Sequence, residues 1–342
     1  MSPAAIADLA ALEALLSEPT PRLIEALTRV EGDIVVLGAA GKMGPTLARM
    51  ARQAADAAGS ERRVIAVSRF TAGGREALES HGVETIACDL LDENAVAALP
   101  DAPNVIYMAG RKFGSTGHEA LTWAMNCYLP SIVCRRYASS RIVAFSTGNV
   151  YGLTAAGHGG SREADPAAPV GEYAMSCLGR ERMFEHFSVT HGTRVVLLRL
   201  NYAVEMRYGV LVDLGARILA GQPIDLTMGF VNVIWQGDAN AMAIAALEHA
   251  ASAAAVVNVA GVEELRVRDV AERLAQRLDR PVAFTGTEAA DALLSNGARG
   301  YEWLGRPRVA TDTLLDWTAA WLLAGGATIG KPTHFASRDG RF

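Results

Sequence analysis

Three glycines at three-residue spacing constrain the fold of this chain more than any other feature of its sequence. They follow an apolar, β-branched run at residues 33–37, and a helical pattern extends from residue 45 to residue 58. A strand, a glycine loop and a helix in this order predict a dinucleotide-binding turn, because the missing side chains permit a tight turn, a close pyrophosphate and close helix packing. The N–H groups of the helix N-terminus then face the phosphate charge. The cofactor contacts predicted in this loop are Gly38, Gly41, Lys42, Met43 and Gly44.

The sequence after the loop alternates between strand-like and helix-like segments. Such alternation predicts an α/β fold with a parallel sheet covered by helices on both faces. We therefore expect a Rossmann-type doubly wound parallel sheet with a smaller C-terminal substrate lobe. The expected strands lie at residues 33–37, 63–67, 83–87, 104–108 and 141–145, with extensions at 194–198 and 256–259.

Three domains are expected along the chain. Residues 1–32 form an N-terminal extension with apolar positions at helical spacing, read as two helices broken at residues 18–21. The dinucleotide-binding Rossmann domain is expected at 33–203 plus 230–260, and the substrate lobe at 204–229 plus 261–342.

The residues after the second and third strands bear on which dinucleotide is bound. An acidic side chain after the second strand would hold the ribose hydroxyls of NAD, but Ser68 and Arg69 occupy that position. A hydroxyl followed by a guanidinium suits a phosphate, so NADP is the preferred expectation and NAD the alternative; Arg69 as a solvated loop residue is the competing interpretation. Asp89, followed by Leu90, suits a bond from the adenine amino group, a helix cap, or both.

A second group of motifs joins the glycine loop in resembling one family. The group comprises Asp89-Leu90, Asn126, the run at 145–152 and a tyrosine 22 residues after Tyr151. Together they resemble the extended (atypical) short-chain dehydrogenase/reductase family of NAD(P)-dependent sugar epimerases and dehydratases, over about residues 33–260. The resemblance implies an oxidoreductase or epimerase of carbohydrate metabolism, acting on a secondary alcohol or ketone of a sugar or sugar-acid-like small molecule.

The resemblance also implies roles for individual residues. Thr147 would hydrogen-bond the reacting oxygen, Tyr173 would act as the acid/base, and Asn126 would organise the proton path. The chemistry supports a hydroxyl at this place, because hydride transfer at carbon must be matched by proton transfer at oxygen. A phenol has a pKa of about 10, so a nearby cation is needed to form phenolate near neutral pH.

The chain departs from the family pattern at Cys177, which stands where the family has a lysine four residues after the tyrosine. A thiol supplies no cation and lacks the reach of lysine toward the nicotinamide ribose. Residues 173, 177 and 180 share one helix face, so Arg180 is the nearest replacement cation in the sequence; a positively charged nicotinamide ring is the alternative. Cys177 itself is expected to pack beside the cofactor rather than to act as a nucleophile.

The C-terminal lobe matches the family only loosely. Many relatives have an arginine before the strand at 231–236, where it meets a diphosphate, and this stretch has none. Asn232 and Trp235, with Asn201, are therefore expected at a neutral or singly charged polyol, with Trp235 as a core residue the alternative. The polar tail at 330–341 is expected to be an exposed terminus, although closure over an acidic substrate is the other possibility.

Composition excludes several classes of protein. A formal charge of -5 gives no excess of basic residues for a polynucleotide, and the longest apolar stretches are too short or too charged for a membrane span. Four cysteines without metal-like spacing suit reduced thiols, so we expect a cytoplasmic protein, a possible homodimer, without a metal site.

Two functional hypotheses remain at this point. One is an enzyme, favoured by the joint presence of Asn126, Thr147 and Tyr173. The other is a catalytically silent NADP-binding sensor or structural partner, favoured by the absent lysine.

Overall fold

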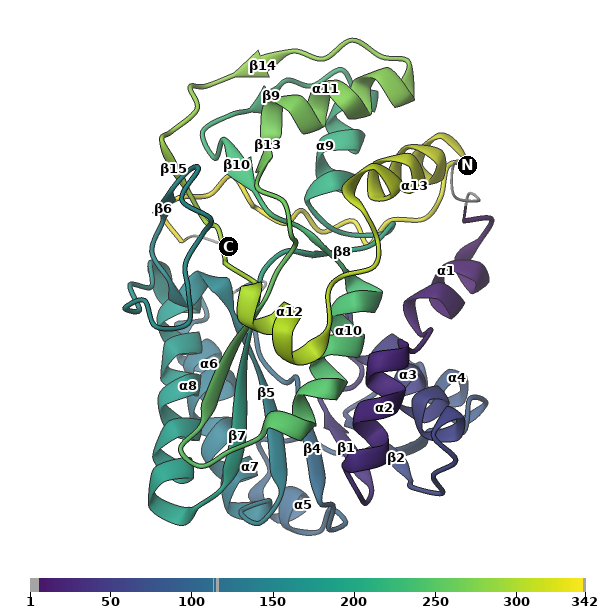
Figure 1. Ribbon diagram of the computed structural model, residues 1–342, viewed down its shortest axis with the longest axis vertical. Helices are drawn as coiled ribbons and strands as arrows, with labels where there is room; N and C mark the ends of the chain where they lie inside the picture. The colour runs from purple at the N-terminus through teal and green to yellow at the C-terminus, as the bar shows by residue number, and fades with distance from the viewer. Residues whose placement is uncertain (1–5, 113, 115–116, 341–342) are drawn as a thin grey trace.

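A seven-stranded parallel sheet organises the lower half of the molecule (Figure 1). The computed structural model describes residues 6–112, 114 and 117–340. The strand order β12-β7-β5-β4-β1-β2-β3 is the Rossmann-type arrangement that the alternating sequence predicts, including the two late strands. The strands are β1 Ile34–Leu37, β2 Val64–Ser68, β3 Glu84–Ala87, β4 Asn104–Tyr107, β5 Arg141–Thr147, β7 Arg194–Leu200 and β12 Ala255–Val259.

Helices cover both faces of this sheet because its central strands are apolar on both sides. In β1, Ile34 and Val36 join the core beneath one helical layer, whereas Val35 and Leu37 join the core on the other face. The first layer holds α2 Pro21–Arg29, α3 Gly44–Ala57 and α10 Gln236–Ala245, and the second holds α5 Glu93–Ala97, α7 Leu129–Arg136 and α8 Gly171–His191. Three further short helices of this half are α4 Arg75–Glu79, α6 Glu119–Trp123 and α12 Ala298–Leu304.

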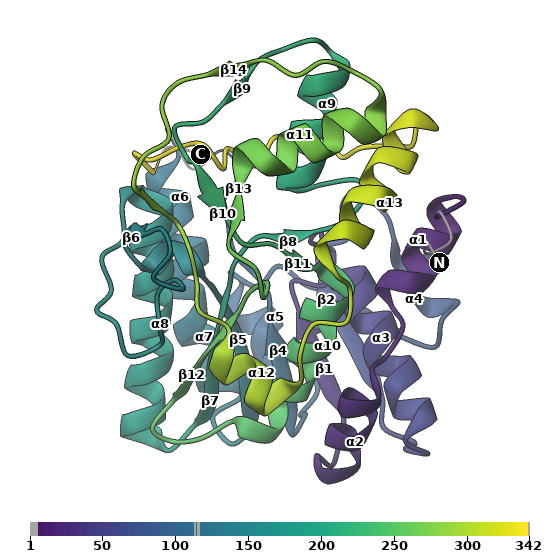
Figure 2. The same ribbon diagram turned by 45° about the horizontal axis from the view of Figure 1, so that its top comes forward.

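A second lobe with its own core lies above the carboxyl edge of the sheet (Figures 1 and 2). Its helices are α9 Val210–Leu219, α11 Val267–Leu278 and α13 Thr311–Leu323. Paired two-residue strands link its loops: β9 Ile224–Asp225 with β14 Phe284–Thr285, β10 Phe230–Val231 with β13 Leu265–Arg266, β8 Ala203–Val204 with β11 Ile234–Trp235, and β6 Thr154–Ala155 with β15 Asp291–Ala292.

The two N-terminal helices pack into different parts of the molecule. Helix α1, Leu9–Leu16, buries Leu12 and Leu16 in the core of the second lobe, while α2 buries Leu23 and Leu27 against the sheet. Glu13 of α1 forms ion pairs with arginines from both halves. The extension therefore spans the two lobes.

Helix α8 runs alongside the sheet and brings its first turns to the carboxyl edge. It begins at Gly171, at φ +82°, where a side chain would overlap the backbone of Gly340, and it ends at Gly192, whose left-handed φ of +73° closes the last turn. Of the helices in the described part of the chain, none is long and apolar enough to cross a membrane.

Candidate active site

The glycine loop between β1 and α3 leaves room on one side only. Gly38 has a φ of +87°, and a Cβ there would lie 2.7 Å from the backbone nitrogen of Ala109. A Cβ on Gly44 would overlap the Ala39 carbonyl, so both glycines are required by the fold itself. A Cβ on Gly41 meets only the Gly38 oxygen at 3.3 Å, so its absence keeps open a space that a pyrophosphate fits.

The strand ends beside this loop carry the other predicted cofactor residues. Ser68 is half-buried at the end of β2 and Arg69 is exposed beyond it. Asp89 accepts a hydrogen bond from the backbone N–H of Leu91 at 3.1 Å, so it does shape its own turn, and Leu90 is buried in the sheet core. These residues lie together at one edge because parallel strands present their carboxyl ends to the same side.

A tyrosine and a threonine meet at the end of β5. Thr147 closes that strand, and Tyr173 projects from the first turn of α8. Burial raises the pKa of Tyr173 well above its usual value, and the nearby charge of Arg180 opposes that shift. Tyr173 and Thr147 line the same cavity, where Thr147 lowers the pKa of the Tyr173 hydroxyl and Cys177 raises it.

Arg180 is held below this pair rather than against the phenol. Its Nη1 donates to the Phe145 carbonyl at 2.8 Å and its Nη2 to Asn126 Oδ1 at 2.6 Å. A Cβ on Gly110 would overlap its guanidinium, so only glycine leaves room for this arginine. Arg180 is 6% exposed, and its charge therefore acts in a region with little water to screen it.

Asn126 joins three segments of the site. It lies in a π-helical turn, Ala124–Tyr128, between α6 and α7. Its Nδ2 donates to the Arg111 carbonyl and to Ser176 Oγ, both at 2.9 Å, while its Oδ1 accepts from the Arg111 N–H at 2.8 Å as well as from Arg180. The π turn, a feature often found at functional sites, thus ties the loop after β4 to α8.

A cavity of about 220 Å³ opens beside Tyr173, and we call it the Tyr173 cavity. Its walls come from the glycine loop, the loop after β4, the end of β5, α8, the segment between β7 and α9, and Thr333 near the C-terminus. The glycine loop and the Tyr173–Thr147 pair thus border one space. Residues on its walls include Lys42, Lys112, Thr147, Tyr173, Asn201 and Tyr208.

The sequence profile of the NAD dependent epimerase/dehydratase family matches residues 34–260. This stretch includes the sheet, the glycine loop and the Tyr173–Thr147 pair. The chain belongs to this family. Its members are enzymes, and the resemblance noted in the sequence is confirmed.

Solved structures of sugar-nucleotide enzymes share the fold of this family member. MoeE5 in complex with UDP-glucuronic acid and NAD has a TM-score of 0.70 at 21% identity, covering 86% of this chain and 100% of that one. UDP-glucose 4-epimerase of Thermus thermophilus, in complex with NAD, has a TM-score of 0.68 at 21% identity, covering 84% of this chain and 97% of that one. DesIV, a dTDP-glucose 4,6-dehydratase from Streptomyces venezuelae, has a TM-score of 0.71 at 18% identity, covering 85% of this chain and 97% of that one. A search of curated protein sequences finds no match.

Lys112 is a cation of this family member that the sequence analysis did not single out. It lies in the loop after β4, and its Nζ is 5.7 Å from the centroid of the Tyr173 ring. Burial lowers its pKa to about 8, while the neighbouring Cys177 and Asp213 oppose that shift. The signal that could have found it is its place, five residues after the end of β4, at the edge where ligands of parallel sheets bind.

Cys177 is fully buried and packs against Val150 and Tyr151, one helical turn below Tyr173. Burial raises the pKa of its thiol, so it carries no charge beside the phenol near neutral pH. The family's lysine position is thus neutral here, and Lys112 is the lysine that approaches the tyrosine.

Of the residues predicted to contact substrate, one lines the Tyr173 cavity and two do not. Asn201 lines the Tyr173 cavity, with its Nδ2 donating to Asn232 Oδ1 at 2.7 Å. Asn232 in turn donates to the Ser295 carbonyl at 2.7 Å, so it supports Asn201 from behind. Trp235 is 1% exposed and packs edge-on against Trp317 in the core of the second lobe. The prediction of Trp235 as a substrate contact is wrong, because its ring is surrounded by apolar side chains.

A buried ion pair that sequence reasoning missed supports β5 and α8 from below. Glu181 of α8 is 0% exposed, and its carboxylate accepts two bonds from the Arg199 guanidinium at 2.9 and 2.7 Å and one from Ser146 Oγ at 2.5 Å. Arg199 also donates to the Tyr151 hydroxyl, at 2.7 Å. This network fixes α8 on β5 and β7, and so fixes Tyr173 next to Thr147.

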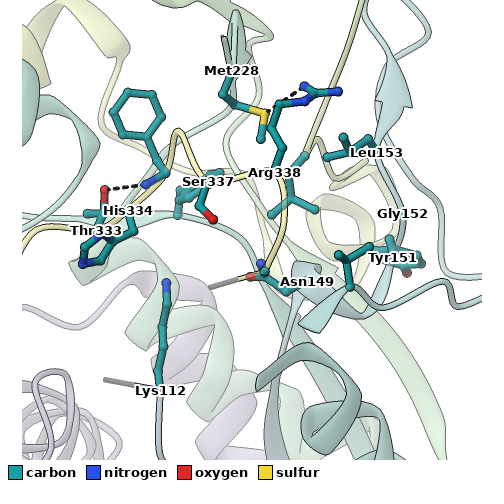
Figure 3. Close-up of a pocket in the computed structure, with 15 residues that line it drawn as sticks. Lys112, Asn149, Tyr151, Gly152, Leu153, Met228, Thr333, His334, Ser337 and Arg338 are labelled. Carbon is teal, nitrogen blue, oxygen red and sulfur yellow. Dashed lines mark hydrogen bonds between the residues drawn. The ribbon is translucent and has the colours of Figure 1, made fainter. Parts of the chain in front are cut away.

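The C-terminal segment, residues 330–340, packs over the cleft instead of projecting into solvent. Thr333 donates from both its N–H and its hydroxyl to Asp213 Oδ2, at 2.8 and 2.6 Å, and Phe335 is buried in the second lobe. Figure 3 shows Lys112 extending toward Thr333 and His334. The expectation of an exposed terminus is wrong for Thr333 and Phe335, which are buried, whereas Lys331 and His334 are exposed; residue 341 lies outside the described residues.

Proposed function

We propose that this protein is an NAD(P)-dependent oxidoreductase or epimerase that acts on a secondary alcohol or ketone of a sugar-like small molecule. The observation that carries the proposal is that Tyr173 and Thr147 lie together in the wall of a cavity that the glycine loop also borders. An acid/base hydroxyl next to a dinucleotide loop is the arrangement that paired hydride and proton transfer requires.

The residues divide the proton chemistry among them. A nicotinamide dinucleotide held on the glycine loop would exchange the hydride with the reacting carbon. Tyr173 gives or takes the proton at the substrate oxygen, and Thr147 hydrogen-bonds the same oxygen. Burial keeps the phenol of Tyr173 protonated, while the charges of Arg180 and Lys112 lower the cost of forming phenolate.

NADP is the preferred cofactor in this proposal. Ser68 and Arg69 stand at the end of β2, where an acidic residue would repel a 2′-phosphate, and Arg69 is exposed to meet one. The solved neighbours in complex with NAD make NAD the alternative.

A dinucleotide sensor without turnover is the second candidate, because Cys177 leaves the family's lysine position uncharged. The placing of Thr147 and Tyr173 on one cavity wall, with the bonded pair Asn126 and Arg180 nearby, favours the enzyme, since a sensor has no need of an ordered acid/base.

The test combines a substrate screen with one substitution. Sugars and sugar acids are screened for reduction of NADP or NAD, and Tyr173→Phe is then compared with the parent. Loss of the hydroxyl is expected to lower kcat by roughly 10²- to 10⁴-fold with cofactor affinity nearly unchanged. Tyr137→Phe, which removes a hydroxyl bonded to Pro100 far from the cavity, is the matched control. If the screen yields turnover that Tyr173→Phe leaves intact, the assignment of the acid/base is wrong; silence across the screen favours the sensor.

A further inference from the structure

The three lysines of this chain gather around one cleft. They are three of its 32 basic Lys and Arg residues, at positions 42, 112 and 331. Lys42 and Lys112 line the Tyr173 cavity, and Lys331 lines the adjoining cavity between α9 and the C-terminal segment. Elsewhere the chain uses arginine as its cation. The cations at this cleft therefore include all three compact ammonium groups of the chain, and a small ligand in the cleft would contact them.

Lys42 begins in the glycine loop, but its side chain reaches the second lobe. Its Nζ donates to the Ala203 carbonyl at 3.2 Å and lies 4.5 Å from the centroid of the Tyr208 ring. An ammonium has three donors, and these contacts use one of them. The nearby carboxylate of Glu205 is engaged by Arg207, whose Nε lies 3.0 Å from Glu205 Oε2. Lys42 thus offers donors to whatever enters the cavity.

The walls of the cavity do not neutralise this charge. Among the described residues that line it, none is Asp or Glu. Asp213, which faces Lys112, holds its Oδ2 against Thr333. Burial lowers the pKa of Lys42 to about 8, opposed by Glu205. A desolvated ammonium such as that of Lys42 is stabilised by an anion that brings its own charge into the cavity.

We propose that the substrate of the Tyr173 cavity carries a carboxylate and that Lys42 binds it. The inference rests on the proposed function and narrows the substrate to small polyol acids. An ammonium also binds phosphate as a point charge, so phosphate esters are the competing anions, and the binding experiment includes them.

The experiment measures binding to protein saturated with oxidised cofactor, by calorimetry. Each acid is paired with a neutral counterpart: gluconate with glucitol, and galacturonate with galactose. Glucose 1-phosphate and UDP-glucose test the phosphate alternative. We expect the acid to bind at least about tenfold more tightly than its neutral partner in at least one pair, as for one charge-assisted hydrogen bond. Equal binding within both pairs, or tighter binding of a phosphate ester than of either acid, would overturn the proposal.

Substitutions then assign the effect to Lys42. Lys42→Gln keeps a donor for the Ala203 carbonyl and removes the charge, so the acid preference should disappear; Lys42→Arg should restore part of it. Arg182→Gln, which removes an exposed charge of α8 that lines neither cavity, is the control that leaves the preference intact. Cofactor affinity is measured in parallel. If Lys42→Gln lowers cofactor affinity about tenfold and leaves the acid preference unchanged, Lys42 binds the pyrophosphate and the proposal fails.

The pH dependence gives an independent readout. Affinity for the acid should hold below pH about 8 and fall above it as Lys42 loses its proton, while affinity for the neutral partner stays level. The groups that face Lys42 are Glu205 and Arg207, which form an ion pair, and Tyr208, whose pKa is raised by burial. Lys112, which faces Tyr173, Cys177 and Asp213, titrates in the same range, so Lys42→Gln must abolish the fall if Lys42 is its source.

The two proposals fail separately. If the protein turns over neutral sugars but not acids, and Tyr173→Phe still lowers kcat, the carboxylate proposal is wrong and the proposed function stands. Binding of acids through Lys42 without any turnover would leave it standing and favour the sensor.

Discussion

The glycine loop and the Tyr173 cavity border each other, yet they are built in opposite ways. The loop is made of seven consecutive residues, and its property is the absence of side chains at Gly38, Gly41 and Gly44. The cavity is made of side chains from six separate segments, and it depends on charges buried behind its wall. A site built from consecutive backbone residues can be recognised in the sequence. A site built from distant side chains can be recognised only in the folded structure.

The largest effect should come from filling the loop. Gly41→Val is expected to lower dinucleotide affinity at least 100-fold while the protein stays folded, because its side chain occupies the space that fits the pyrophosphate. Gly44→Val is the contrasting variant, since its side chain overlaps the Ala39 carbonyl and should destabilise the fold itself. Calorimetry with NADPH and NADH, together with thermal unfolding, separates the two. Full binding by folded Gly41→Val would show that the phosphates lie elsewhere.

An intermediate effect should come from the two cations near Tyr173. Lys112→Met removes a charge 5.7 Å from the phenol ring, so the pKa of Tyr173 should rise, and the rise of activity with pH should move upward by about one unit. Arg180→Met also removes a charge, but it leaves the Phe145 carbonyl without this donor and Asn126 Oδ1 with only the Arg111 N–H, at a cost of roughly 1–3 kcal/mol in unfolding free energy.

Rescue distinguishes these cations from each other. In a Lys112→Met background, Cys177→Lys returns an ammonium to the position the family uses and should move the pH profile back. If Lys112→Met leaves the profile unmoved while Arg180→Met shifts it, Arg180 is the replacement cation that the helix-face argument predicts.

The smallest effect concerns the choice of cofactor. Arg69→Ala should lower the affinity for NADPH about fivefold to tenfold and leave the affinity for NADH unchanged, since an exposed arginine contributes a screened contact to a 2′-phosphate. Competitive titration of the two cofactors measures the difference. A parent protein that already prefers NADH would contradict the argument from the end of β2.

The sequence predicted best where neighbours in the chain are neighbours in space. The strand series and the sheet followed from the alternating pattern, and Tyr173 and Cys177 share a helix face as their spacing requires. Trp235 was misjudged because an aromatic residue beside polar ones gives no local sign of a core partner such as Trp317. Lys112 was overlooked because its approach to Tyr173 depends on how the loop after β4 meets α8, which periodicity does not encode.

The N-terminal helices have a consequence for how the molecule is made. Leu12 and Leu16 are synthesised about 300 residues before Trp317 and Phe335, yet one core buries all four. These contacts cannot form until α13 and Phe335 have been synthesised, and pairings so distant in sequence close slowly. A nascent chain stalled before α13 would present the apolar face of α1 without these partners.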